Sequence, residues 1–307
     1  MNWKCKSFLH TFFSKVPLGE RLAYLSQRYL TKSLPVTDDK FVSVVSLVNQ
    51  HLEVFRKHCS RPLGEVNFYE FGAGWDMIVP LTFYAFGVER QILVDLRTLL
   101  RGNLVNDTIE KFQRVKLDFA LSRKPDRLLN DVSSGFLLPL KQYYGIDYRA
   151  PCDARNTGLQ KDSIDCISST NTLEHIPKED IRLILRECHR LLQRDGLMTF
   201  LIDYQDHYSY FDDGISAYNF LQYSDKDWAF FNPRLHYQNR LRHQDYLDLL
   251  NEEGFEIVVE NRTEGTQADL EILEKLSLEK RFEAYKLTEL AVRKAHVLVR
   301  KKDNGSL

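Results

Sequence analysis

Two glycines that follow a short apolar run are the first residues of the chain with a recognisable binding chemistry. Residues 66–71 are mostly apolar and include Glu70, and Gly72 and Gly74 come directly after them. A strand, a glycine turn and a helix in this order let the backbone approach a nucleotide-like ligand at the carboxyl end of a parallel sheet. Asp95 closes the next apolar run, 21 residues after Gly74. An acid at that distance suits the two hydroxyls of a ribose, so the spacing predicts a nucleoside site.

Two neighbours of this turn argue against a pyrophosphate ligand, and hence against a nicotinamide-dependent enzyme. A dinucleotide site needs a third glycine at the position of Met77. Glu70 places a carboxylate beside the turn, where it would repel a phosphate and attract an ammonium group. A ligand with a ribose, a positive amine and no phosphate is S-adenosylmethionine. Residues 70–74, Glu-Phe-Gly-Ala-Gly, resemble the first motif of class I S-adenosylmethionine-dependent methyltransferases; a glycine turn in an unrelated α/β protein is the alternative.

A second match to the same family follows a later apolar run. Residues 163–169 read as a strand, and Leu-Glu-His at 173–175 precedes a helix. This segment resembles the family at the end of its fourth strand. The resemblance implies that Asp153 binds the adenine amino group and that Asn171 lies where donor and acceptor meet; spacing alone leaves Asp153 equally well explained as a surface turn acid. The residues expected to bind S-adenosylmethionine are Glu70, Gly72, Gly74, Asp95, Asp153 and Asn171.

Candidates for a catalytic base follow the fourth and fifth predicted strands. Methylation of a hydroxyl requires a group that takes its proton, and histidine titrates near neutral pH. We expect His207 to be this base, oriented by Asp203 or Asp206; a surface loop histidine is the alternative. His175 is the second catalytic candidate, although in the resembled family this position often shapes the helix start beside the donor. These side chains and Glu174 would suit a magnesium ion, but no compact ligand motif occurs, and we predict no metal site.

The charge balance, the cysteines and the lengths of the apolar stretches argue against a nucleic-acid-binding, disulfide-rich or membrane-spanning protein. The chain has 307 residues, with 42 basic against 43 acidic side chains, so no global field draws it to nucleic acid. Its five cysteines are scattered and form no Cys-x-x-Cys pair, which favours reduced thiols in a cytoplasmic protein. No apolar stretch is long enough to cross a bilayer, and the first residues lack the pattern of a signal peptide.

The order of apolar runs predicts an α/β fold, a doubly wound, Rossmann-like sheet of seven strands. We expect most strands to be parallel and the last, at 295–300, to be antiparallel, as in the resembled family. Residues 1–60 are expected to form an N-terminal helical extension, and residues 61–303 the methyltransferase domain. The other predicted strands span residues 66–71, 91–94, 146–153, 163–169, 197–202 and 255–259, and the later helices residues 178–192, 242–253 and 267–288.

The N-terminal extension combines helical apolar spacing with a basic bias. Its first 32 residues carry six lysines and arginines against one acid. We expect these helices to cap the sheet or to form one wall of the substrate pocket. The alternative is peripheral contact with an anionic membrane surface, which a basic amphipathic helix can make.

An aromatic-rich insertion follows the fifth strand, at about residues 204–240. Most of its rings are expected to form a helical core, and a few to line an acceptor pocket, because aromatic faces stack on sugars and planar ligands. The whole pattern resembles bacterial methyltransferases of surface polysaccharide or O-antigen synthesis. We therefore expect O-methylation of a sugar hydroxyl in a surface glycan or its precursor. The alternatives are a small-molecule nitrogen or aromatic hydroxyl as acceptor, and a non-catalytic binding protein on the same fold.

Overall fold

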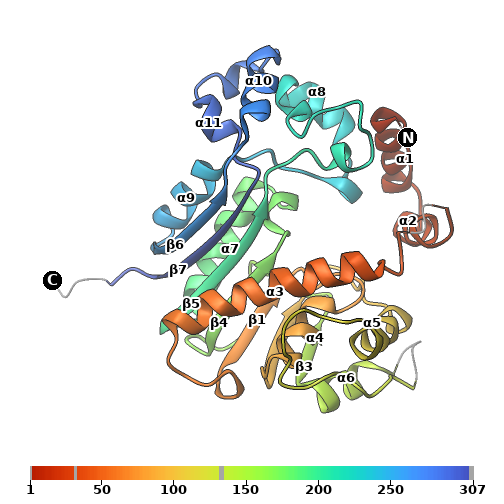
Figure 1. The fold of residues 1–307 in the computed structure, drawn as a ribbon, viewed down its shortest axis with the longest axis vertical. Coiled ribbons are helices and arrows are strands. Elements are labelled where there is room, and N and C mark those ends of the chain that lie inside the picture. Colours follow the sequence, from red (N-terminus) through yellow and green to blue (C-terminus); the bar gives the residue numbers. More distant parts are fainter. Residues whose placement is uncertain (1, 31–32, 131–134, 304–307) are drawn as a thin grey trace.

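A single sheet of seven strands organises the computed structural model, which describes residues 2–30, 33–130 and 135–303 (Figure 1). The strand order is β3-β2-β1-β4-β5-β7-β6. Strands β1 to β5 pair in parallel, and β7 is antiparallel to both of its neighbours. The predicted fold class is therefore confirmed. The strands are β1 (Asn67–Phe71), β2 (Arg90–Val94), β3 (Ile146–Arg149), β4 (Ile164–Thr170), β5 (Leu192–Asp203), β6 (Phe255–Thr263) and β7 (Lys294–Lys301).

Helices cover both faces of this sheet, and others gather beyond the carboxyl ends of its parallel strands. In Figure 1, α3 crosses the sheet in front, α8, α10 and α11 lie at the upper end of the molecule, and α1 and α2 lie on its right side. The helices are α1 (Trp3–Lys15), α2 (Gly19–Leu25), α3 (Asp38–His58), α4 (Ile78–Ala85), α5 (Gly102–Arg114), α6 (Leu137–Tyr144), α7 (Lys178–Leu191), α8 (Asp225–Phe231), α9 (His243–Glu252), α10 (Gln267–Lys275) and α11 (Leu287–Leu290).

Alternate residues of each central strand supply the two halves of the core. In β1, Phe68 packs in the cluster that contains Val48 and Phe55 of α3, whereas Tyr69 and Phe71 pack on the opposite face. This alternation follows from the two-residue period of a strand. Because both faces are covered, β1 is buried along nearly its whole length.

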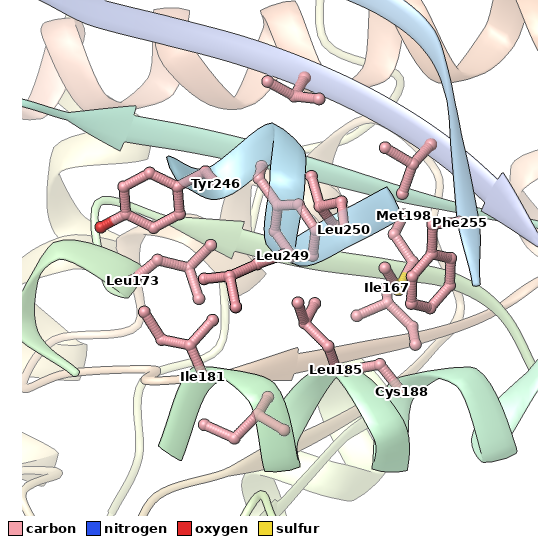
Figure 2. Packing of buried hydrophobic residues seen from close by; sticks show 14 of the residues in the cluster. Ile167, Leu173, Ile181, Leu185, Cys188, Met198, Tyr246, Leu249, Leu250 and Phe255 are labelled. Carbon is pink, nitrogen blue, oxygen red and sulfur yellow. The ribbon is translucent and has the colours of Figure 1, made fainter. Parts of the chain in front are cut away.

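The second face is closed by α7 and α9. Figure 2 shows Ile181, Leu185 and Cys188 of α7 pointing toward Leu249 and Leu250 of α9. The three α7 positions are spaced four and three residues apart, so they lie on one side of the helix. This packing fixes α7 against β4, and with it the segment that joins them.

Several element boundaries differ from those predicted. The helix expected over 267–288 ends at Lys275, and the chain then places Phe282 and Leu290 in a separate apolar cluster. Burial of these side chains outweighs the helical propensity of the intervening residues. Strand β3 ends at Arg149 rather than at residue 153, since Pro151 has no N–H group for the ladder. Strands β5 and β6 are longer than expected.

The N-terminal helix packs on the insertion that follows β5. The ring of Trp3 lies 4.8 Å from that of Phe231 and 5.5 Å from that of Tyr208, centroid to centroid. The backbone N–H of Trp3 donates a hydrogen bond of 2.8 Å to Asp212. The N-terminal helix and the insertion after β5 thus contribute to one aromatic cluster. Its buried members also include Tyr218, Phe220 and Trp228.

Candidate active site

A cavity lies at the carboxyl ends of β1, β2 and β4, where the strand order reverses between β1 and β4. Open α/β sheets bind their ligands at such a switch point. Its volume is about 610 Å³. Ligand pockets commonly enclose about 300–1,000 Å³, so a nucleoside and part of an acceptor fit together. Seven of the predicted site residues line it: Gly72, Gly74, Asp95, Asp153, Asn171, His175 and His207.

The two glycines of the turn are required for different reasons. Gly72 has φ +82°, and a Cβ built on it would lie 2.5 Å from Cγ2 of Thr172. Only a glycine therefore lets the turn after β1 pack against the segment after β4. Gly74 has φ +76°, and a Cβ there would have no heavy atom within 4 Å among the described residues. Gly74 thus leaves open space in the cavity wall, which fits a ligand that approaches the backbone closely.

Asp95 directs a nearly buried carboxylate to the cavity; its side chain is 6% exposed. The hydroxyl of Tyr148 donates a hydrogen bond of 3.0 Å to Oδ2. Burial raises the pKa of Asp95 to about 7, although this hydrogen bond favours the charged form. Near neutral pH the group can therefore accept two hydrogen bonds as a carboxylate, as a ribose diol requires.

Asp153 and Asn171 line the cavity, and the Asp153 side chain is already ion-paired. The guanidinium of Arg155 donates two hydrogen bonds to the Asp153 carboxylate, from Nε to Oδ1 at 3.0 Å and from Nη2 to Oδ2 at 2.6 Å. This pairing lowers the pKa of Asp153. Arg155 also donates to Asp180, so an ion-paired rim borders the side predicted to hold adenine. Asn171 is left-handed, with φ +50°, and its backbone N–H donates to the Leu201 carbonyl at 2.8 Å.

Glu70 does not belong to the cavity wall as the structure describes it. It is 4% exposed, and the two-residue period of β1 places its side chain on the same face as Phe68. Burial raises its pKa well above the usual range, and the charge of Asp95 adds to the rise. Direct contact between Glu70 and a bound amine, as the sequence suggested, is not supported. Glu70 lies behind the turn instead.

Four histidines line the cavity: His10, His175, His207 and His236. The rings of His175 and His207 are 4.8 Å apart, and those of His10 and His236 stack at 5.0 Å. Nδ1 of His175 lies 2.7 Å from the Tyr237 carbonyl oxygen; because a carbonyl only accepts, Nδ1 carries the proton and Nε2 keeps its lone pair.

The protein around these rings disfavours their charged forms. Desolvation lowers the pKa of both His207 and His10 to about 4. It also lowers the pKa of His175, whose side chain is exposed to the cavity. All three imidazoles are consequently neutral at pH 7. Each has a lone pair that can accept a proton or bind a metal ion.

The carboxylates expected to orient His207 have other partners. Asp203 lies outside the cavity wall and accepts hydrogen bonds from Gln205 and from the hydroxyl of Tyr210. Asp206 accepts from the backbone N–H of Tyr208 and from Asn219, each at 2.9 Å. Among the described residues, neither carboxylate forms a hydrogen bond with the His207 ring. Asp203 is near enough only for its charge to favour the protonated ring.

Two of the four histidines were missed as site residues. His10 lies on the face of α1 that also carries Trp3 and Ser7, and their spacing of four and three residues marks it as inward-facing. His236 appears in the sequence only as one member of an aromatic-rich run. The expectation that the N-terminal helices form one wall of the pocket agrees with His10 and Gln27 lining the cavity.

One protein family matches part of this chain, and several solved structures are similar to it. The family described as "Methyltransferase domain" matches residues 131–200. This match confirms the predicted enzyme class, a methyltransferase, at the level of the domain, and S-adenosylmethionine, the predicted cofactor, agrees with that class. No curated protein matches the chain.

The similar solved structures are distant from this chain. The 1,6-didemethyltoxoflavin-N1-methyltransferase of Burkholderia thailandensis, with bound S-adenosylhomocysteine, is 16% identical over 92% of this chain and 88% of its own, with a TM-score of 0.47. The geranyl diphosphate C-methyltransferase of Streptomyces coelicolor A3(2), also with S-adenosylhomocysteine, is 12% identical over 88% and 86%, with a TM-score of 0.46. The CurJ carbon methyltransferase is 13% identical over 79% of this chain and 50% of its own, with a TM-score of 0.42. At this similarity they carry no argument about chemistry.

Proposed function

We propose that this protein transfers a methyl group from S-adenosylmethionine to a hydroxyl group. The observation that carries the proposal is the composition of the cavity. One part of its wall offers the open glycine turn and Asp95, and another part offers neutral His175 and His207. A nucleoside donor and an acceptor held between these parts would have the reacting atoms near the histidines.

The residues of the donor side have separate roles in this proposal. Asp95 accepts the ribose hydroxyls, and Asn171 and the turn at Gly74 border the amino acid part of the donor. Asp153 and the Arg155 pair border the base. The bound donor supplies the methyl group as an electrophile. The protein then contributes mainly proximity and alignment, which can lower a barrier by roughly 7–11 kcal/mol.

The proton of the acceptor hydroxyl is assigned to Nε2 of His207. This nitrogen is buried and has no hydrogen-bond partner among the described residues. The backbone N–H of His207 donates to Oε1 of Gln238 at 2.9 Å, which holds the residue at the start of its 3-10 turn (His207–Tyr210). A positioned base typically contributes about 10²–10⁴-fold to the rate.

For the acceptor we propose a sugar hydroxyl of a surface glycan or of its precursor. Tyr237 and Trp75 line the cavity, and aromatic faces suit the apolar faces of sugar rings. The same rings suit an aromatic hydroxyl, which is the second candidate. Liquid chromatography and mass spectrometry of glycans from a deletion strain, searched for the loss of one methyl group, separate the two.

The N-terminal helices are also proposed to touch an anionic membrane surface, where a lipid-linked precursor would lie. The outward face of α1 exposes Phe8 (52%) and Phe12 (59%) between Lys4 and Lys15. Apolar rings flanked by lysines are typical of helices that lie in the headgroup layer. No helix in the described ranges is long and apolar enough to span a bilayer.

Donor binding is tested with a matched pair of glycine variants. Gly74 and Gly158 both have positive φ and nothing near a built Cβ among the described residues, but only Gly74 lines the cavity. Both changes to Leu impose similar backbone strain. Calorimetry should show S-adenosylhomocysteine binding to the wild type and to Gly158→Leu, and at least tenfold weaker binding to Gly74→Leu. If the wild-type protein does not bind S-adenosylhomocysteine at millimolar concentration, the proposed function is wrong and the protein is a non-catalytic scaffold on this fold.

A further inference from the structure

Three potential metal ligands converge beside the cavity, which two of them, His175 and His207, line. Glu174, His175 and His207 each offer one ligand atom, and these atoms lie within 4.8 Å of one another. The first two belong to the 3-10 turn Leu173–His175 after β4, and His207 begins the turn after β5. Two imidazoles and one carboxylate bind catalytic zinc or non-haem iron while leaving coordination positions open.

Glu174 is a buried carboxyl group that lacks hydrogen-bond partners among the described residues. It is 3% exposed, and neither carboxylate oxygen has a hydrogen-bond partner among the described residues. Burial raises its pKa well above the usual range, and nearby backbone N–H groups offset the rise only in part. A buried carboxyl group with both oxygens unpaired is costly, and a directly bound cation would satisfy it.

Both imidazoles are prepared for metal binding. The hydrogen bond from Nδ1 of His175 to the Tyr237 carbonyl fixes the ring and leaves Nε2 free, as outer partners of metal-bound histidines do. Nε2 of His207 is buried without a partner in the described part of the chain. Desolvation keeps both rings neutral at pH 7, which is the form that binds a metal.

The geometry requires only a small contraction. Bonds of about 2.0–2.2 Å place tetrahedral ligands about 3.4 Å apart, so the three atoms, which lie within 4.8 Å of one another, would approach by up to about 1.4 Å when an ion binds. Asp203, held by Gln205 and Tyr210, adds a negative charge nearby. Lys294 approaches Asp203 at 3.7 Å and partly balances this charge.

We propose that Glu174, His175 and His207 bind one divalent transition-metal ion, with an open coordination position that faces the cavity. The sequence predicted no metal site, and this proposal departs from that prediction. Ion binding stands on these three side chains alone, whereas its use in catalysis rests on the proposed function. In that use Nε2 of His207 is a ligand and does not take the acceptor proton, a role it has only in the ion-free protein; the acceptor oxygen would instead coordinate the ion, which would make its hydroxyl more acidic. The proton passes to solvent, the oxygen–methyl bond forms, and the carbon–sulfur bond breaks to release S-adenosylhomocysteine.

The test titrates metal-stripped, tag-free protein with Co²⁺ and follows the visible absorption bands of the bound ion. The variants are Glu174→Gln, which keeps the side-chain volume, and His207→Ala. The control is His58→Ala, an exposed histidine at the end of α3. We expect one ion per wild-type chain and the same for the control. Each site variant should bind at least about 100-fold more weakly, because loss of an outer partner alone can cost 10–100-fold.

Calorimetry with S-adenosylhomocysteine on the same samples separates this inference from the proposed function. Site variants that bind the nucleoside normally are folded, and their loss of Co²⁺ then supports the metal site. Wild-type protein that binds the nucleoside but takes up no Co²⁺ overturns the metal site alone, as do site variants that match the control. Protein that binds Co²⁺ but no nucleoside overturns the proposed function and leaves the metal site in place.

Discussion

Gly72 lies directly against Thr172, so that a Cβ added to the glycine would come within 2.5 Å of Cγ2 and 2.8 Å of Oγ1 of the threonine. The contact joins the turn after β1 to the segment after β4. These are the two segments whose sequences resemble methyltransferase motifs, and the structure shows that they depend on each other sterically.

This contact predicts the outcome of a double-mutant cycle. Gly72→Ala should lower the free energy of unfolding by roughly 1–3 kcal/mol, since it adds strain at positive φ to a steric clash. Thr172→Ala in the same chain should restore part of the loss, because it removes Cγ2 and Oγ1. Gly158→Ala, which adds strain at φ +68° without a neighbour, is the control. Urea unfolding measures the cycle, and additive effects would contradict the contact.

Asp95 predicts a pH-dependent affinity for the donor. Its pKa of about 7 means that the carboxylate forms as pH rises from 6 to 8, so S-adenosylhomocysteine should bind more tightly across that interval. Asp95→Asn should weaken binding about tenfold or more at pH 8 and abolish the dependence, which calorimetry in matched buffers measures. A wild-type affinity that stays flat between pH 6 and 8 would refute the assignment.

The same carboxyl group affects stability with the opposite sign. Its folded pKa is raised above the model-peptide value of 3.8, so its contribution is fully present below pH 3.8 and is lost as pH rises through about 7. In the absence of ligand, Asp95→Asn should therefore stabilise the protein at pH 8 relative to wild type. The gain should shrink toward pH 4, as thermal unfolding at the two pH values can show.

His207→Ala should separate binding from turnover. Turnover should fall by about 10²–10⁴-fold if the ring takes the proton, while nucleoside affinity stays within about twofold of wild type. Because the pKa of His207 is about 4, the acid limb of the rate profile should lie well below 6.5. His58→Ala is the matched control. Full turnover in His207→Ala would remove this residue from the mechanism.

The exposed face of α1 predicts binding to anionic vesicles. Phe8→Ser with Phe12→Ser should reduce sedimentation with phosphatidylglycerol-containing vesicles several-fold, because the two rings supply most of the apolar contact. Neutral phosphatidylcholine vesicles serve as the control for charge. Wild-type protein that remains in the supernatant with both kinds of vesicle would contradict membrane contact.

The fold and one side of the site follow from short-range signals in the sequence. Gly72, Gly74 and Asp95 lie within one strand-turn-helix-strand unit, so their spacing is sufficient to place them together. The direction of Glu70 was not predictable in the same way. Strand β1 is buried on both faces, and its residues show no alternation of polar and apolar side chains that would reveal which way Glu70 points.

The histidine side of the cavity depends on contacts between distant residues. His10 and His236 are more than two hundred positions apart, yet their rings stack because α1 packs on the insertion after β5. The hydrogen bond from His175 to Tyr237 spans 62 positions. Such contacts leave no local pattern. The interrupted helix after Gln267 has the same origin, since burial of Phe282 and Leu290 overrides local preference.

The ring of Tyr24 stacks on Trp75 at 5.5 Å, and His10 and Gln27 complete the cavity wall that the sheet leaves open. Residues 2–30 therefore supply part of the wall of the proposed substrate cavity. Exchange of residues 2–30 between homologous chains should alter which acceptors are methylated while the nucleoside site keeps its chemistry.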